Sequence, residues 1–196
     1  MRAGATAGIA PSAERRVGAV IGMVAGWLAY VGGLVLVATA AMTIASIVGR
    51  ALARIIAVPV LGLSLGPVPG DYELVGTGCA IAVFAFLPYC QFHRGNITVD
   101  MFFAKARPGT IAFTSLIGNV LLTAAAALIA WRLQAGMIDR YTYGETSYIL
   151  QFPTWWGYAS ALVGAWAFAV VGLYTAWRSF NEWRGDGETL TSEIAQ

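Results

Sequence analysis

The sequence predicts an all-α integral membrane protein with four transmembrane helices, with both chain termini on the cytoplasmic side and short interfacial segments in the loops. Of the 196 residues, 58% are hydrophobic and only 11% are charged, whereas soluble domains carry about a quarter charged residues. Four stretches contain no Asp, Glu, Lys or Arg, namely 17–49, 74–92, 108–131 and 146–177. A helix needs about 20 apolar residues to cross a hydrocarbon core of about 30 Å, so each stretch qualifies.

These stretches predict a single membrane domain over residues 1–196 with spans at about 17–49, 72–92, 109–132 and 153–178. A segment in lipid must satisfy its own backbone hydrogen bonds, so each span is expected to be helical. The first stretch follows Arg15 and Arg16 as a signal peptide would, but it exceeds the roughly 7–15 apolar residues of a signal core. We therefore expect an uncleaved anchor, with polar cytoplasmic tails at 1–14 and 181–196.

The segment between the first two spans, residues 55–70, is short for a crossing and contains Pro59, Pro67 and Pro69. Proline removes helical hydrogen bonds and clashes with the preceding turn. An interfacial or re-entrant loop is favoured here, and a fifth crossing remains open as an alternative.

The distribution of basic residues predicts the orientation. With four spans, eight Lys and Arg residues lie on the side of the termini and four lie on the other side. Basic residues concentrate in cytoplasmic loops, which places both termini and the loop after the second span in the cytoplasm.

Tryptophans at both ends of the last span predict where it meets the membrane surfaces. Trp155 and Trp156 stand at one end and Trp177 at the other, about 33 Å apart along a helix. Aromatic belts fall at such separations, so these three residues are predicted to be interfacial anchors.

The spans contain little that could carry chemistry. Ion and proton pathways use intramembrane charged residues, and the charge-free stretches supply none. The single histidine, His93, and the two cysteines give too few ligands for a zinc or haem site. The net charge of +2 is too small to indicate nucleic-acid binding. We expect no catalytic residue, no cofactor and no metal.

Small and polar residues inside the spans predict helix packing instead. Gly18, Gly22 and Gly26 recur at a spacing of four, which places them on one helix face suited to close backbone approach. A similar ladder of Gly157, Ala161, Ala165 and Ala169 occurs in the last span. In the third span Ser115, Asn119 and Thr123 form a stripe, and we expect Asn119 to bond another helix.

The stretch HRGNITVDMF at 93–102 is the most polar interruption between two spans. Ile97 and Val99 alternate with polar residues as in a short extended segment, and Asp100 could cap a brief helix. Together with Arg94 they are predicted to form a cytoplasmic turn that fixes how the protein sits in the membrane.

Four pieces of the sequence resemble the small membrane (Q) subunit of tripartite ATP-independent periplasmic (TRAP) transporters. They are PVPGDYELV at 67–75, FLPYCQFHRGNITVDMF at 86–102, the Tyr/Glu-rich stretch around Glu145, and FPTWWGYASALVGA at 152–165. The likeness extends from about residue 17 to residue 180. Asn96 stands where the family often has histidine, while the Ile97–Asp100 piece is intact.

The resemblance implies a noncatalytic subunit in the bacterial inner membrane that scaffolds a large multi-span permease subunit. That partner would hold the substrate and sodium sites for organic-acid uptake, and a periplasmic substrate-binding protein would deliver the substrate. Asp71, Glu73, Arg140 and Glu145 are then plausible docking contacts, although Glu73 and Arg50 could instead stabilise the interfacial loop. A four-span accessory subunit of another carrier, such as a tricarboxylate system, or of an unrelated membrane complex, is the alternative.

Overall fold

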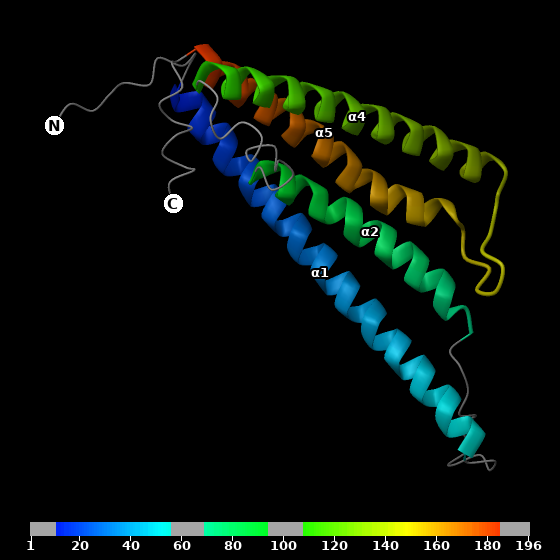
Figure 1. Ribbon diagram of the computed structural model, residues 1–196. Helices are drawn as coiled ribbons and strands as arrows, with labels where there is room; N and C mark the ends of the chain where they lie inside the picture. The colour runs from blue at the N-terminus through cyan, green and yellow to red at the C-terminus, as the bar shows by residue number, and fades with distance from the viewer. Residues whose placement is uncertain (1–10, 56–68, 94–107, 185–196) are drawn as a thin grey trace.

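The computed structural model describes residues 11–55, 69–93 and 108–184 and contains four helices. They are α1 (Pro11–Ile55), α2 (Asp71–Phe92), α4 (Pro108–Thr142) and α5 (Trp155–Arg184) (Figure 1). Each is long and apolar enough to cross a membrane. The predicted fold class, an all-helical chain with four candidate spans, is confirmed.

The helices run past the predicted spans at several ends. Residues 11–14, assigned by sequence to a tail, form the first turn of α1, and α5 continues to Arg184. A helix does not have to end where the apolar stretch ends, because charged residues such as Glu, Lys and Arg are good helix formers. Loss of hydropathy therefore indicates the membrane boundary and not the helix boundary.

The start of α2 is fixed by Gly70, which precedes its first turn. Gly70 has φ 72°, a left-handed conformation that glycine adopts without strain. A side chain there would also meet Leu150, because a Cβ built on Gly70 lies 2.6 Å from Leu150 Cγ. Asp71 and Glu73 follow in the first turn, where a carboxylate is favoured by the helix dipole.

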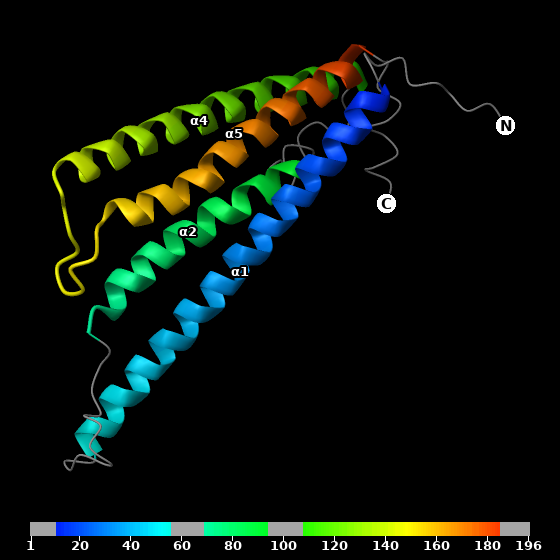
Figure 2. The same cartoon turned by 180° about the vertical axis from the view of Figure 1, so that it is seen from behind.

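The four helices form a layer in the order α1, α2, α5, α4, because each packs mainly against its neighbours in that order. Figures 1 and 2 show that they converge where α1 begins and α5 ends and fan apart at the opposite end. We call the convergent end, marked by Gly18, Phe92 and Ser179, the tail end. The opposite end, marked by Ser46, Asp71 and Trp155, is the loop end.

A seam with a seven-residue repeat joins the antiparallel helices α1 and α2. A Cβ built on Gly32 would lie 2.8 Å from Ala85 Cβ, and one built on Gly78 would run into Thr39. Buried or half-buried small residues of α1 recur every seven positions, at Gly18, Ala25, Gly32, Thr39 and Ser46; of these, Gly32, Thr39 and Ser46 contact α2, whereas Gly18 lies against Tyr174 of α5. Such a repeat is typical of helix pairs that wind around each other with a left-handed twist.

Helix α5 lies between α2 and α4 and is the most buried span. It approaches α2 closely at Gly164, where an added Cβ would collide with the backbone carbonyl of Phe84. On the other side Gly172 lies against Thr123 of α4. Ala161, Ala165 and Ala169 are buried along the same helix. Small side chains let membrane helices gain van der Waals contact through close approach.

Candidate functional site

Four buried polar side chains at the tail end connect three helices; we call Gln91, Asn119, Thr175 and Ser179 the tail-end cluster. Gln91 of α2 donates through Nε2 to Thr175 Oγ1 of α5 at 2.8 Å and to Asn119 Oδ1 of α4 at 3.2 Å. Asn119 in turn donates through Nδ2 to Ser179 Oγ of α5 at 2.8 Å. All four residues are at most 1% exposed.

The cluster fixes how α2, α4 and α5 are rotated against one another. A buried amide that loses its partner costs about 1–3 kcal/mol, so other rotations of these helices are disfavoured. In membrane proteins an interhelical hydrogen bond contributes on average only about 0.6 kcal/mol. The cluster therefore determines how the three helices are oriented more than it adds to the free energy of unfolding.

Asn119 is the predicted member of this cluster, and its neighbours in the predicted stripe behave differently. Thr123 donates to the Asn119 carbonyl oxygen at 2.6 Å within its own helix. The side chain of Ser115 lies outside the part of the chain whose side chains are described. Asn119 is thus the residue of the stripe that reaches other helices.

The other three members were missed by sequence reasoning. Gln91 stands one residue from the end of α2 in an aromatic stretch, and Thr175 and Ser179 are four residues apart on α5. A signal was present, because a spacing of four places Thr175 and Ser179 on the same face of their helix, as it does Asn119 and Thr123. The pairing between helices is a tertiary property that such spacing does not contain.

At the loop end Glu73 of α2 holds the hairpin-like loop of residues 145–154. Its carboxylate accepts hydrogen bonds from the Ser147 hydroxyl and from the backbone N–H groups of Ile149 (2.9 Å) and Leu150 (3.2 Å). The loop also closes on itself through an isolated antiparallel bridge between Thr146 and Pro153. Glu73 therefore acts as an acceptor for a turn whose N–H groups have no ladder partner.

Two ion pairs accompany this loop. Arg50 near the end of α1 donates through Nη2 to Asp71 Oδ2 at 3.0 Å, and the Ser46 hydroxyl donates to the same oxygen at 2.5 Å. Arg140, in the last turn of α4, pairs with the Glu145 carboxylate. We call these contacts and the Glu73 contact the loop-end clasps. All four predicted docking residues, Asp71, Glu73, Arg140 and Glu145, thus have partners within the chain.

The predicted glycine face of α1 is divided by the structure. A Cβ on Gly18 would collide with the Tyr174 hydroxyl, and one on Gly22 would lie 2.9 Å from Phe92 Cζ, but Gly26 has no neighbouring atom within 4 Å. Gly18 thus packs against α5 and Gly22 against α2, and a packing role for Gly26 stays a prediction.

The predicted aromatic anchors lie at opposite ends of α5. Trp155 packs edge-on against Tyr141 and Trp156, with ring centroids 5.6 and 6.1 Å apart. Trp156 is 58% exposed. Trp177, near the tail end, packs edge-on against Tyr174 at 6.3 Å. An amphipathic ring that is partly packed and partly exposed fits a membrane–water boundary.

The predicted loop motif, Arg94, Ile97, Val99 and Asp100, lies outside the described residues, as do residues 56–68 of the ambiguous loop and the tail residues 1–10 and 185–196. His93, at the end of α2, is exposed, and its Nδ1 lies 3.1 Å from the Tyr89 carbonyl oxygen. Within residues 11–55, 69–93 and 108–184, no group of three metal-ligating side chains occurs. The polar contacts described above join helices and shape a loop.

Comparison with known proteins gives one match. A family model described as "Tripartite ATP-independent periplasmic transporters, DctQ component" matches residues 39–182, which is most of the chain. The matched region begins at Thr39, in the second half of α1, and includes the tail-end cluster and the loop-end clasps. No curated protein and no solved structure gives a significant match.

Proposed function

The chain belongs to the DctQ family of small permease subunits of tripartite ATP-independent periplasmic transporters, and we propose that it is the noncatalytic scaffold for the large transport subunit. As a member of this family it is a transporter component and not an enzyme. Its four apolar helices make it a multi-pass membrane protein.

The scaffold proposal rests on one observation: the buried polar side chains of the tail-end cluster hydrogen-bond one another between helices. In the tail-end cluster the side-chain hydrogen bonds connect helices of this same chain. Each candidate span contains a long stretch without Asp, Glu, Lys or Arg, although ion pathways usually depend on a charged residue inside the membrane. Ion coupling and substrate binding are therefore assigned to the large subunit, for which this layer supplies a defined surface.

The layer leaves much apolar surface for a membrane partner. Only 11% of the α1 span is buried within the chain, and large apolar side chains such as Trp27, Leu34 and Val37 are more than 60% exposed. Membrane helices associate through packing and not through exclusion of water. We propose that part of this surface contacts the large subunit and the rest contacts lipid.

We assign the tail end to the cytoplasm and the membrane to the bacterial inner membrane. The support is the excess of Lys and Arg on the side of the termini, eight against four, because positive residues remain inside. A fluorescent protein fused after Gln196 should fluoresce in the cytoplasm. Alkaline phosphatase fused at Gly144 should be active in the periplasm, and the opposite pattern would reverse the orientation.

The loop end then faces the periplasmic substrate-binding protein. The docking residues Asp71, Glu73, Arg140 and Glu145 are engaged within the chain, which supports an indirect role for them. In this proposal Glu73 shapes the loop, and the exposed Tyr148 and Ile149 at its turn make contact with the incoming protein. Uptake would be coupled to an ion, with sodium and an organic acid as the expected pair.

Mild-detergent purification tests the scaffold proposal. The tagged chain should bring down one large multi-span subunit in equal amount, and the complex should also bind its substrate-binding protein. Purification of a different complex would support the alternative of an accessory subunit for another carrier. The family match is what favours the TRAP assignment over that alternative.

A further inference from the structure

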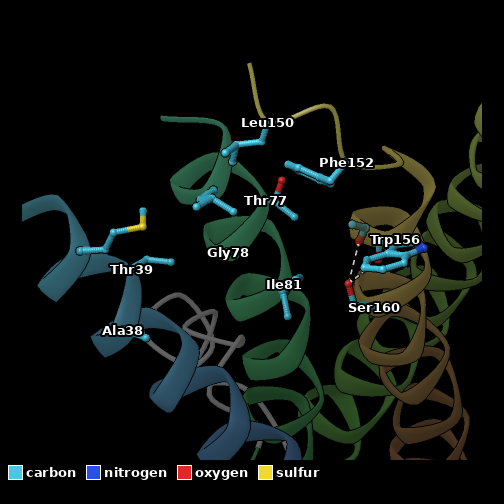
Figure 3. Close-up of a pocket in the computed structure, with 12 residues that line it drawn as sticks. Ala38, Thr39, Thr77, Gly78, Ile81, Leu150, Phe152, Trp156 and Ser160 are labelled. Carbon is cyan, nitrogen blue, oxygen red and sulfur yellow. Dashed lines mark hydrogen bonds between the residues drawn. The ribbon is translucent and has the colours of Figure 1, made fainter. Parts of the chain in front are cut away.

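A groove near the loop end lies between α1, α2 and α5 and has a volume of about 790 Å³. Figure 3 shows α2 as its floor, with Thr39 on the α1 side and Trp156 and Ser160 on the α5 side. Leu150 and Phe152 lie over the end of the groove nearest the loop. The volume falls within the range of about 300–1,000 Å³ typical of small-molecule sites.

The groove presents almost only apolar surface, because its hydroxyl groups are turned toward their own helices. Thr39 donates to the Leu36 carbonyl oxygen and Thr77 to that of Glu73, both at 2.9 Å. Ser160 donates to the Trp156 carbonyl oxygen at 2.7 Å. A ligand with polar groups would find no free hydrogen-bonding side chain among these three, so the groove fits a hydrocarbon chain.

A pair of opposite charges stands at the level where a lipid headgroup would lie. Arg50 is two helical turns beyond the groove residue Met42, and Asp71 is one turn before the groove residue Leu74. The Arg50 side chain is 50% exposed, and its contacts to Asp71 and Ser46 are both made by Nη2. Within the described part of the chain Nε and Nη1 have no partner, and they can donate to a phosphate.

We propose that this groove binds one acyl chain of a zwitterionic phospholipid whose phosphate is held by Arg50 and whose ammonium group lies near Asp71. Arg50 and Asp71 lie side by side, so they complement the phosphate and the ammonium of a phosphoethanolamine headgroup better than they complement an anionic headgroup. The proposal depends on the chain spanning a membrane and not on the scaffold function.

The dimensions of the groove favour a lipid chain over a helix of another protein. Its floor runs from Leu74 to Ile81, about 10 Å at about 1.5 Å per residue. One leaflet is about 15 Å of hydrocarbon, so the groove receives the part of a chain nearest the headgroup. A partner helix that crosses the hydrocarbon core is about 30 Å long and would need a longer open channel than this floor of about 10 Å.

Native mass spectrometry of the full chain, with added palmitoyl-oleoyl phosphatidylethanolamine or the matching phosphatidylglycerol, tests the proposal. The wild type should retain one phosphatidylethanolamine and bind it more tightly than phosphatidylglycerol. Ala38→Phe, which fills the groove from an exposed position, should remove this binding. Arg50→Gln should weaken the binding of both lipids about tenfold, since a hydrogen bond to the phosphate that both carry is lost, and the preference for phosphatidylethanolamine should remain because Asp71 is unchanged.

Matched controls separate the groove from the remaining lipid-facing surface. Ala127→Phe places the same ring on an exposed face of α4, and Arg132→Gln removes a charge from that helix; both should bind lipid as the wild type does. If Ala38→Phe fails to fold, Ser160→Phe fills the groove from the α5 wall. Equal lipid retention by the wild type and the groove-filled variants would overturn the proposal. Photo-crosslinking from position 38 in cells to a polypeptide would also overturn it.

Discussion

The two ends of the helix layer are held together by different chemistry. The tail-end cluster consists of neutral side chains that are at most 1% exposed and that join α2, α4 and α5. The loop-end clasps consist of carboxylates and arginines that are partly exposed, with 41% exposure for both Arg140 and Glu145. The tail end should therefore determine how the helices pack, and the loop end should determine the shape of the loop.

The difference follows from solvation. Burying a charged pair removes two ions from water and is often not repaid by their attraction, so ion pairs are expected where water remains accessible. Neutral amides and hydroxyls cost less to bury and still demand partners. Helix α1 has no side chain in the tail-end cluster as described, and it meets that end through glycines against Tyr174 and Phe92.

The largest expected effect comes from Gln91→Leu at the tail end. The change removes the donors to Asn119 and Thr175 and leaves the Asn119 amide oxygen without its Gln91 partner in a buried site. We expect the free energy of unfolding in detergent to fall by about 1–3 kcal/mol. Reversible unfolding of the purified protein, followed by circular dichroism, measures it.

The comparison is sharpened by two further variants. Gln134→Leu makes the same substitution at a half-buried position of α4 and should change stability by less than about 0.5 kcal/mol. The double variant Gln91→Leu with Asn119→Leu should lose less than the sum of the single losses, because it removes both partners. Additive losses would show that the two side chains do not interact.

Glu73→Gln should alter the loop more than the helices. A neutral amide offers only one acceptor oxygen to the Ser147 hydroxyl and the N–H groups of Ile149 and Leu150. Hydrogen exchange at Ile149 and Leu150 should rise about tenfold, as local opening becomes easier, while exchange in α5 stays unchanged. The matched Glu145→Gln should leave the exchange at these two N–H groups as it is.

Arg50→Gln should have a smaller effect on stability than either of these changes. The Arg50–Asp71 pair is half-exposed on the arginine side, and such pairs contribute little because water and salt screen them. The Ser46 hydroxyl still donates to Asp71. Thermal unfolding at low and high salt should show a small loss at low salt that disappears at high salt, and a salt-independent loss would contradict a screened pair.

The smallest effect is expected at Gly26, and its comparison with Gly32 tests the seven-residue seam. Gly26→Ala meets no atom within 4 Å and should be neutral or stabilise the helix by up to about 1 kcal/mol. Gly32→Ala places a methyl group 2.8 Å from Ala85 Cβ and should destabilise by about 1–3 kcal/mol. Equal behaviour of the two variants would exclude the seam described for α1 and α2.

The fold class was readable from the sequence because long uncharged stretches reveal the spans directly. The spacing of Gly18, Gly22 and Gly26 predicted a packing face, but the spacing alone did not show that Gly18 meets α5 and Gly22 meets α2. Asn119 was found because a lone amide in a span requires a partner. Gln91 and Ser179 escaped because only the packed helices show which side chains meet.

The docking residues show a similar limit. Their position at the ends of spans was visible, but a carboxylate that binds a partner protein and one that binds a loop have the same sequence signal. Only the folded chain shows that the Glu73 carboxylate accepts hydrogen bonds from the N–H groups of Ile149 and Leu150 and so binds a loop. Glu73 binds the loop of residues 145–154 and Arg50 binds Asp71, whereas the alternative expectation, that both stabilise the loop of residues 55–70, concerns a segment that lies mostly outside the described residues.

Reconstitution into liposomes tests the scaffold function most directly. The purified chain alone, the large subunit alone and the two together are each supplied with the substrate-loaded binding protein and an inward sodium gradient. The scaffold function predicts uptake only when both subunits are present, and none from this chain alone. Sodium-dependent uptake by this chain alone, or full uptake by the large subunit without it, would contradict that function.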